Sequence, residues 1–311
     1  MLVRLTPNLA LNRTVRCTVF IWRTSARPAG SLAFEHMATA AKRADEYELF
    51  YREFDSPLMR QLRAEAYGED IGQHSWVDAG ELREDSRRLR LGPRSRLLDL
   101  GSGPCGPLTF LIAHSGCHGV GLELSASAIE IGRSRATTLE VESRFTAYVA
   151  DLNDPLPRDL GQFDAVLAID IVLHLQERET LFRRVAAMLS PGGRFLLTDA
   201  GVITGAISNE EIRRRSIHGF TQFVPLGWNE AQLESAGFRL LECENRTPSV
   251  VRNAGGRLRA LQGHQHELQQ LTGVSSFEKQ VEYVGTVEAL AARGALSRFM
   301  YLAELRRQNA G

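Results

Sequence analysis

The sequence has no excess of charge of either sign and no apolar run long enough to span a bilayer. Lys plus Arg and Asp plus Glu number 37 each, so the formal net charge is zero. This balance gives no electrostatic basis for binding nucleic acid or an anionic membrane, and we expect neither partner. Arginines do cluster within residues 87–96 and at 213–215, but such runs are typical of solvated helix faces.

Cysteine is scarce as well. The 311 residues contain four cysteines, and none forms a C-x-x-C pair. This spacing argues against a zinc site and against a disulfide framework. We therefore expect no metal site and a reducing, cytoplasmic setting. The cysteines are Cys17, Cys105, Cys117 and Cys243.

Acidic residues are missing from the first 34 residues, which nevertheless carry five arginines. Such a bias is found in organelle transit peptides. It is also found in an upstream extension that precedes the true start of a protein, here Met37. We predict that residues 1–36 are an unstructured extension, and a targeting or regulatory segment is the alternative.

Short apolar runs alternate with helical patterns from about residue 94 onwards. The runs RLLDL, GVGLEL, FTAYVA, FDAVLAI and GRFLLTD are typical of buried strands, and the segments between them predict helices. This alternation indicates a parallel sheet with crossover helices. Residues 249–292 are polar and helix-like, and RFMYLAEL predicts a last strand. We predict a doubly wound, Rossmann-like α/β domain over residues 94–311, with a helical insertion at about 249–293.

A helical cap is predicted ahead of this domain, over residues 37–93. Four aromatic residues recur at i, i+3, i+4 and i+7, which places them on one face of a helix over residues 44–67. A second helix is predicted over residues 79–91, where Gly92 and Pro93 end it. The four aromatic residues are Tyr47, Phe50, Tyr51 and Phe54.

A glycine-rich loop follows the first strand, in the stretch LLDLGSGPCG at residues 97–106. The pattern G-x-G-x-x-G alone does not distinguish a dinucleotide from another nucleoside. Asp99, two residues before the first glycine, would repel a pyrophosphate and attract a cationic group. Glu123 ends the next strand, where an acid can accept hydrogen bonds from ribose hydroxyls, and Asp151 follows the third strand, where it could accept from an adenine amino group.

Five motifs in this order resemble the class I S-adenosylmethionine-dependent methyltransferases. They are LLDLGSGPCG, VGLEL, VADL, FDAVLAIDIVLHL and LSPGGRFLLTD, and the resemblance covers roughly residues 54–305. It implies S-adenosyl-L-methionine as the cofactor and methyl transfer as the reaction. The residues implied to bind the cofactor are Gln73, Asp99, Gly101, Gly103, Glu123, Leu124, Asp151, Leu152 and Asp170.

Two further segments resemble the small-amine N-methyltransferases that act on glycine, sarcosine and phosphoethanolamine. FDSPLMRQLRAEAYGEDIGQHSW is similar to the segment ahead of their cofactor domain, and DIVLHL is similar to the phosphoethanolamine branch, where the histidine matching His174 lies beside the acceptor. Ala200 stands where that branch has a tyrosine, and its phosphate ligands fall near His218 and Phe220. The aromatic residues of this region favour a less polar acceptor.

The expected function is methyl transfer to the amine or hydroxyl group of a small molecule, by a monomer or a homodimer. His174 is the candidate catalytic residue, either as a base or as a group that orients the acceptor, and the alternative is a structural histidine in the turn after the fourth strand. A second hypothesis is a cofactor-binding regulatory module without transfer activity. The weaker candidates for contact with the acceptor are Tyr51, His74, His218 and Phe220.

Overall fold

The computed structural model describes residue 48 and residues 51–216 and 220–306. All of them belong to one compact unit that spans residues 40–311. The predictions for residues 1–36, and those for Tyr47, Phe50 and His218, lie outside the described residues.

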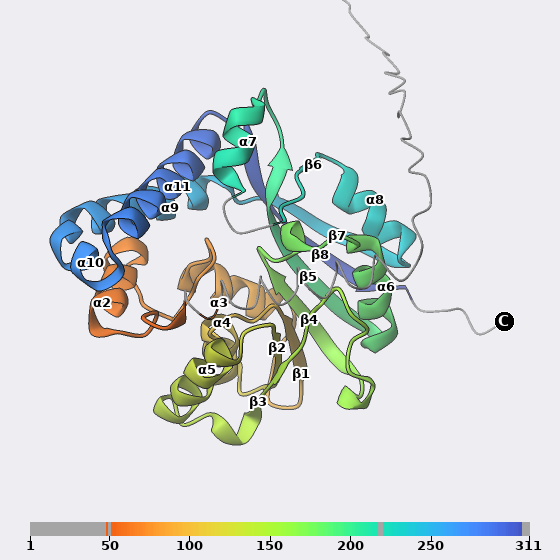
Figure 1. The fold of residues 1–311 in the computed structure, drawn as a ribbon. Helices are drawn as coiled ribbons and strands as arrows, with labels where there is room; N and C mark the ends of the chain where they lie inside the picture. The colour runs from red at the N-terminus through yellow and green to blue at the C-terminus, as the bar shows by residue number, and fades with distance from the viewer. Residues whose placement is uncertain (1–47, 49–50, 217–219, 307–311) are drawn as a thin grey trace, which may run out of the picture. The chain divides into compact units, whose positions relative to one another are not determined.

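An eight-stranded sheet forms the centre of this unit, in the order β3-β2-β1-β4-β5-β8-β7, with the short β6 paired to β5 (Figure 1). β8 runs antiparallel to both of its neighbours, and every other pair is parallel. The predicted doubly wound α/β sheet is confirmed. The chain reverses its direction of winding between β1 and β4, and a ligand is expected at the carboxyl ends of these strands. The strands are β1 (Arg96–Leu100), β2 (His118–Glu123), β3 (Phe145–Val149), β4 (Phe163–Ile169), β5 (Leu189–Ile203), β6 (Val224–Pro225), β7 (Phe238–Asn245) and β8 (Leu296–Leu305).

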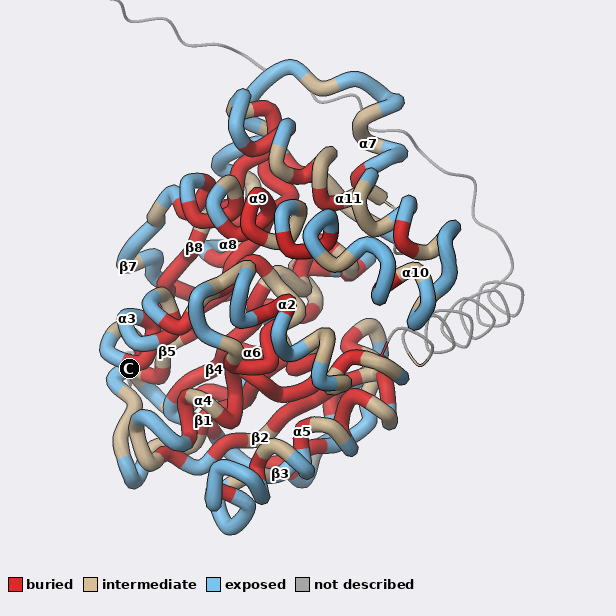
Figure 2. Tube along the Cα trace, turned by 90° about the vertical axis from the view of Figure 1, so that its left-hand side faces the viewer, coloured by how far each residue is buried: buried red, intermediate tan, exposed pale blue. Residues whose placement is uncertain are grey.

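Helices cover both faces of the sheet because successive strand residues point to opposite faces. Leu97 packs with α3, α4 and α5 on one face, whereas Leu98 packs with α6 and α8 on the other. Figure 2 shows these central strands as buried, with exposed residues on the outer helices. The helices are α3 (Ala79–Arg88), α4 (Gly106–Ser115), α5 (Ala126–Thr138), α6 (Arg178–Met188), α7 (Asn209–Arg215) and α8 (Trp228–Ser235), with three 3-10 turns, η1 (Glu142–Arg144), η2 (Arg158–Leu160) and η3 (Val172–His174).

Four other helices gather beside the sheet (Figure 1). They share one apolar cluster, to which Leu62, Trp76, Leu261 and Phe277 contribute. Three of them lie between β7 and β8 in the sequence. None of the helices that the structure describes is long and apolar enough to cross a membrane. The four are α2 (Pro57–Tyr67), α9 (Thr247–Gly263), α10 (Gln265–Thr272) and α11 (Val274–Ala292).

The prediction of one continuous helix over residues 44–67 is wrong. Residues 52–55 form a turn, and α2 begins only at Pro57. A residue before proline is driven out of the helical region, and Ser56 accordingly has ψ of 154°. Its side chain accepts a hydrogen bond from the Met59 amide at 3.4 Å, which caps the new helix. The aromatic spacing therefore continued past a break that the Ser-Pro pair imposes.

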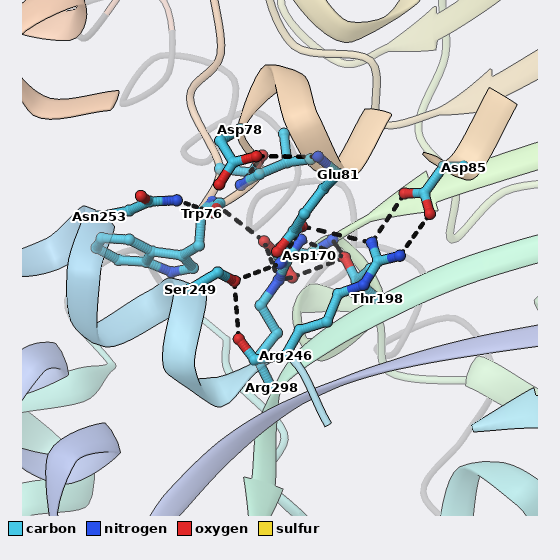
Figure 3. Close-up of polar contacts among 12 residues, drawn as sticks. Trp76, Asp78, Glu81, Asp85, Asp170, Thr198, Arg246, Ser249, Asn253 and Arg298 are labelled. Atoms are coloured by element: carbon cyan, nitrogen blue, oxygen red, sulfur yellow. Dashed lines mark hydrogen bonds and ion pairs between the residues drawn. The ribbon is translucent and has the colours of Figure 1, made fainter. Parts of the chain in front are cut away.

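A buried network of ion pairs joins the cap to the sheet (Figure 3). Arg298 on β8, whose side chain is fully buried, contacts Asp170 at 2.9 Å and Glu81 at 2.7 Å. Glu81 on α3 also lies 3.4 Å from Arg246, which pairs in turn with the buried Asp85. The network ties α3, the residue after β4, and β8 together through side chains that are at most 12% exposed.

We expect Arg298→Met to lower the free energy of unfolding by about 3–5 kcal/mol, because the carboxylate of Asp170 would stay buried without its cation and Glu81 would keep only Arg246, at 3.4 Å. Denaturant unfolding followed by circular dichroism measures this loss. Arg239→Met is the control, since that side chain is 63% exposed in its pair with Glu304 and exposed pairs contribute less than about 1 kcal/mol. Equal stability of the two variants would show that the network does not hold the cap.

Candidate active site

A cavity of about 520 Å³ lies at the carboxyl ends of the strands. This volume is within the usual range for a small-molecule site. Its lining comes from the residues that follow β1, β2, β3 and β4, and from the cap and the helices α7, α9 and α11. The sheet therefore supplies one side of the cavity and helices supply the other.

The loop after β1 allows backbone atoms to border this cavity. Gly101 has φ of 65°, and a Cβ there would lie 2.4 Å from Cγ1 of Ile171. At Gly106, where α4 begins, a Cβ would lie 2.2 Å from the carbonyl oxygen of Gly72. Only glycine fits these two positions, because one needs a positive φ and both leave no room for a side chain.

Glu123 at the end of β2 holds this loop in place. Its carboxylate accepts hydrogen bonds from the amides of Gly103 at 2.8 Å and Ser125 at 3.0 Å. Burial raises the pKa of Glu123, although these two hydrogen bonds oppose the rise. A carboxylate has about four acceptor sites, so acceptor capacity remains for a ligand hydroxyl group.

Asp99 on β1 is buried and lines the same cavity. Among the described residues, none donates a hydrogen bond to its carboxylate. Burial, and then the nearby charge of Glu123, raise the pKa of Asp99 well above its usual range. A buried carboxylate without a partner is costly, and a cationic group of a ligand would stabilise its ionised form.

Three of the other predicted cofactor residues line the cavity next to these acids. Leu124 follows Glu123, and Leu152 follows Asp151. The Oδ1 atom of Asp151 accepts from the backbone and side-chain amides of Asn153, both at 2.9 Å. The structure thus brings together Asp99, Gly101, Gly103, Glu123, Leu124, Asp151 and Leu152.

Gln73 and Asp170 are placed otherwise than the sequence led us to expect. Gln73 is buried outside the cavity lining, where its amide bonds the backbone of Ile71 at 3.0 Å and of Glu69 at 3.2 Å. Asp170 borders the cavity, but both of its carboxylate oxygens face Arg298. These contacts engage both side chains with the protein itself and fix the loops that carry them.

The predicted acceptor residues Tyr51, His74, His174 and Phe220 all line the cavity. The Tyr51 hydroxyl lies 3.2 Å from Nδ1 of His74. Nδ1 of His174 lies 3.2 Å from the backbone carbonyl oxygen of Phe220. A carbonyl only accepts, so Nδ1 carries the proton and Nε2 keeps its lone pair. Burial lowers the pKa of His174 to about 4, which makes the ring neutral at pH 7.

Sequence reasoning missed the residues that the helices contribute. The sequence pattern favoured a solvated helix face for the run 213–215. Arg213 and Arg214 are exposed as expected, but Arg215 is buried and lines the cavity. Adjacent helix residues point in directions about 100° apart, so one member of a charged run can face inward. No local pattern marks the others, which are Trp76 in the loop before α3 and the helix residues Arg257, Ser276, Lys279, Gln280 and Tyr283.

Comparison with known proteins identifies the family. A family profile described as a methyltransferase domain matches residues 97–193. The sarcosine/dimethylglycine N-methyltransferase of Halorhodospira halochloris is 30% identical over 195 residues, which cover 60% of this chain and 67% of that protein. The methyltransferase GfsG of Streptomyces halstedii is 28% identical, over 53% of this chain and 61% of its own length. The chain belongs to the class I S-adenosylmethionine-dependent methyltransferases.

Solved structures agree with this fold. Phosphoethanolamine N-methyltransferase 2 of Haemonchus contortus, in complex with phosphomonomethylethanolamine and S-adenosylhomocysteine, has a TM-score of 0.69 at 20% identity. The match covers 84% of this chain and 60% of that one. Among curated relatives the coverage is likewise partial, since the chain spans 61% of GfsG.

The residues of the cavity fit S-adenosylmethionine, the cofactor of this family. Its sulfonium and ammonium groups are cationic, and Asp99 offers a buried carboxylate that no described residue neutralises. Glu123 has acceptor sites for ribose hydroxyls, and the glycine loop leaves space for close approach. The expected cofactor is therefore consistent with both the family and the chemistry of the site.

We expect the affinity for S-adenosylhomocysteine to fall as the pH falls through the raised pKa of Asp99, because protonation removes the charge that attracts the ligand's ammonium group. Binding should release protons, which calorimetry in two buffers of different ionisation enthalpy measures. Asp99→Asn should weaken binding roughly tenfold or more and reduce the proton release. Asp159→Asn, at an exposed position, is the control. Unchanged affinity in Asp99→Asn would remove this residue from the cofactor site.

Proposed function

We propose that this protein transfers the methyl group of S-adenosylmethionine to an amine or hydroxyl group of a small-molecule acceptor. The observation that carries the proposal is one continuous cavity that is lined both by Asp99 and Glu123 and by His174, which lies in the turn η3 after β4. When bound, the cofactor supplies an activated methyl group on its sulfonium. The protein then has to hold the acceptor atom in line with that methyl and exclude water.

In this proposal His174 orients the acceptor. Its neutral ring presents Nε2 as a hydrogen-bond acceptor, which suits the N–H of a neutral amine or the O–H of an alcohol or phenol. A base whose conjugate acid has a pKa of about 4 has little driving force to remove a proton fully at pH 7. The low pKa thus favours the orienting role over the role of general base.

The cap completes the site. Tyr51, His74 and Trp76 line the cavity from residues 37–93, and the Trp76 amide donates to Asp170 at 3.2 Å. We propose that this segment is the cover that keeps water from the transferring methyl group. The absence of a C-x-x-C pair from the sequence favours a cytoplasmic enzyme, as a monomer or homodimer. The balanced charge favours the absence of a nucleic-acid or membrane partner.

Incubation with cofactor carrying a labelled methyl group tests the proposal. The acceptors are panels of amines, phenols and alcohols, and label should appear in the small-molecule fraction. Asp99→Asn is the negative control, since it should bind the cofactor poorly. Tight binding of S-adenosylhomocysteine without label transfer to any panel would favour a regulatory module instead.

We expect His174→Ala to lower kcat/KM roughly three- to tenfold on the first acceptor found, because it removes one neutral hydrogen bond worth about 1 kcal/mol. The pH profile of the wild type should show no ionisation of His174 above pH 5, given its lowered pKa. His174→Gln should keep part of the activity, since its amide can still accept. His118→Ala, at an exposed position at the start of β2, is the control. An inflection between pH 6 and 7 that disappears in His174→Ala, with a loss of about 10²-fold or more, would make His174 a general base.

A further inference from the structure

The helical side of the cavity carries three cationic side chains, Arg215 on α7, Arg257 on α9 and Lys279 on α11. None of them forms a salt bridge with another described residue. Arg215 is only 4% exposed, and arginine is almost never buried to this degree without a carboxylate partner. Arg215 instead contacts Tyr283, whose hydroxyl accepts a hydrogen bond from Nη1 at 2.7 Å and whose ring centroid lies 5.2 Å from the guanidinium carbon.

Two of the three cations contact one pair of aromatic rings. The ring centroids of Trp76 and Tyr283 are 6.5 Å apart. The guanidinium carbon of Arg257 lies 5.0 Å from the Trp76 ring. Lys279 precedes Tyr283 by four residues on α11 and therefore shares its helix face. The cations and rings together border the same end of the cavity.

Charge in the cavity is divided between its two sides. The acids that line it all lie at or just after the carboxyl ends of strands, and none comes from α7, α9 or α11. The cations that line it all come from these helices. A ligand that fills the cavity would therefore meet carboxylates at the sheet and cations at the helices. The lining acids are Asp99, Glu123, Asp151 and Asp170.

We propose that Arg215, Arg257 and Lys279 form an anion subsite that binds a carboxylate or phosphate group of the methyl acceptor. Trp76 and Tyr283 cover the apolar part of that acceptor. The positive charge of Arg215 acts on His174, so the subsite lies within electrostatic range of the orienting ring. The acceptor is thus a molecule with an anionic group at one end and the methylated N–H or O–H at the other. This inference rests on the proposed function, since it assigns the acceptor to the part of the cavity that the cofactor does not use.

The carboxylate of the cofactor is the other anion that these cations could receive. The two occupants differ in a measurable way. If the cations hold the acceptor, their substitution leaves the affinity for S-adenosylhomocysteine unchanged. If they hold the cofactor carboxylate, that affinity falls together with anion binding.

The test uses protein saturated with S-adenosylhomocysteine and inorganic phosphate or acetate as the probe. The sequence contains only two lysines, Lys42 and Lys279, so reductive methylation with ¹³C-formaldehyde gives a simple NMR spectrum. The methylated Lys279 side chain keeps its positive charge. We expect phosphate or acetate, but not chloride at the same ionic strength, to shift the Lys279 signal saturably. A response to one of the two probes alone distinguishes a phosphate subsite from a carboxylate subsite.

Variants supply the second readout. Arg257→Met should weaken the anion response of Lys279 roughly tenfold, as expected for the loss of a charge-assisted hydrogen bond, whereas Arg259→Met at an exposed position of the same helix should not. Arg215→Met tests the buried member, with Arg214→Met as its exposed control. If Arg215→Met fails to fold, Arg257→Met and the Lys279 signal still decide the question.

Three results would overturn the anion subsite. They are a Lys279 signal that no probe shifts beyond the chloride control, an anion response that Arg257→Met leaves unchanged, and a loss of S-adenosylhomocysteine affinity in Arg257→Met. Failure of the wild type to bind S-adenosylhomocysteine would instead contradict the proposed function. The two failures are therefore distinguishable.

Discussion

The pairing of Arg298 with Asp170 and Glu81 is the contact on which the cap, the sheet and the site all depend. Its side chain is fully buried, and its charge is balanced by carboxylates from α3 and from the residue after β4. Asp170 has φ of 52°, a conformation that is costly for a residue with a side chain and persists where surrounding contacts fix it. Those contacts include the Trp76 amide and the Thr198 hydroxyl, so one carboxylate positions both a cap residue and a central strand.

A buried acid of the site, Asp99, lowers the stability of the folded chain. Burial and the charge of Glu123 raise the pKa of Asp99, so the folded state holds the proton of Asp99 more tightly than the unfolded state does. This residue therefore subtracts stability as the pH rises from the ordinary carboxyl range through its raised pKa. A bound cation reverses the penalty. The buried Arg215 likewise has no carboxylate partner among the described residues, and in our proposal a bound anion supplies one.

The α/β alternation was predictable from sequence because strands and crossover helices leave local apolar patterns. β1, β4 and β8 lie close to the runs that predicted them, and the glycine loop lies at the end of β1 as expected. The break before α2 was missed, since the helix predicted over residues 44–67 ran past a Ser-Pro pair whose backbone preference was stronger. The short β6 was missed too, because two residues carry no periodicity.

The sequence by itself determined which chemical groups stand at the strand ends, since Asp99, Glu123 and Asp151 each lie at or just after the end of a readable strand, and the carboxyl ends of parallel strands meet at one edge. Only the tertiary structure decided how each side chain is used. Asp170 pairs with Arg298, which is 128 residues away in the chain, and Gln73 bonds its own loop rather than the cavity. Arg257 and Lys279 reach the cavity because α9 and α11 pack beside α2, an arrangement fixed by long-range apolar burial that no local spacing encodes.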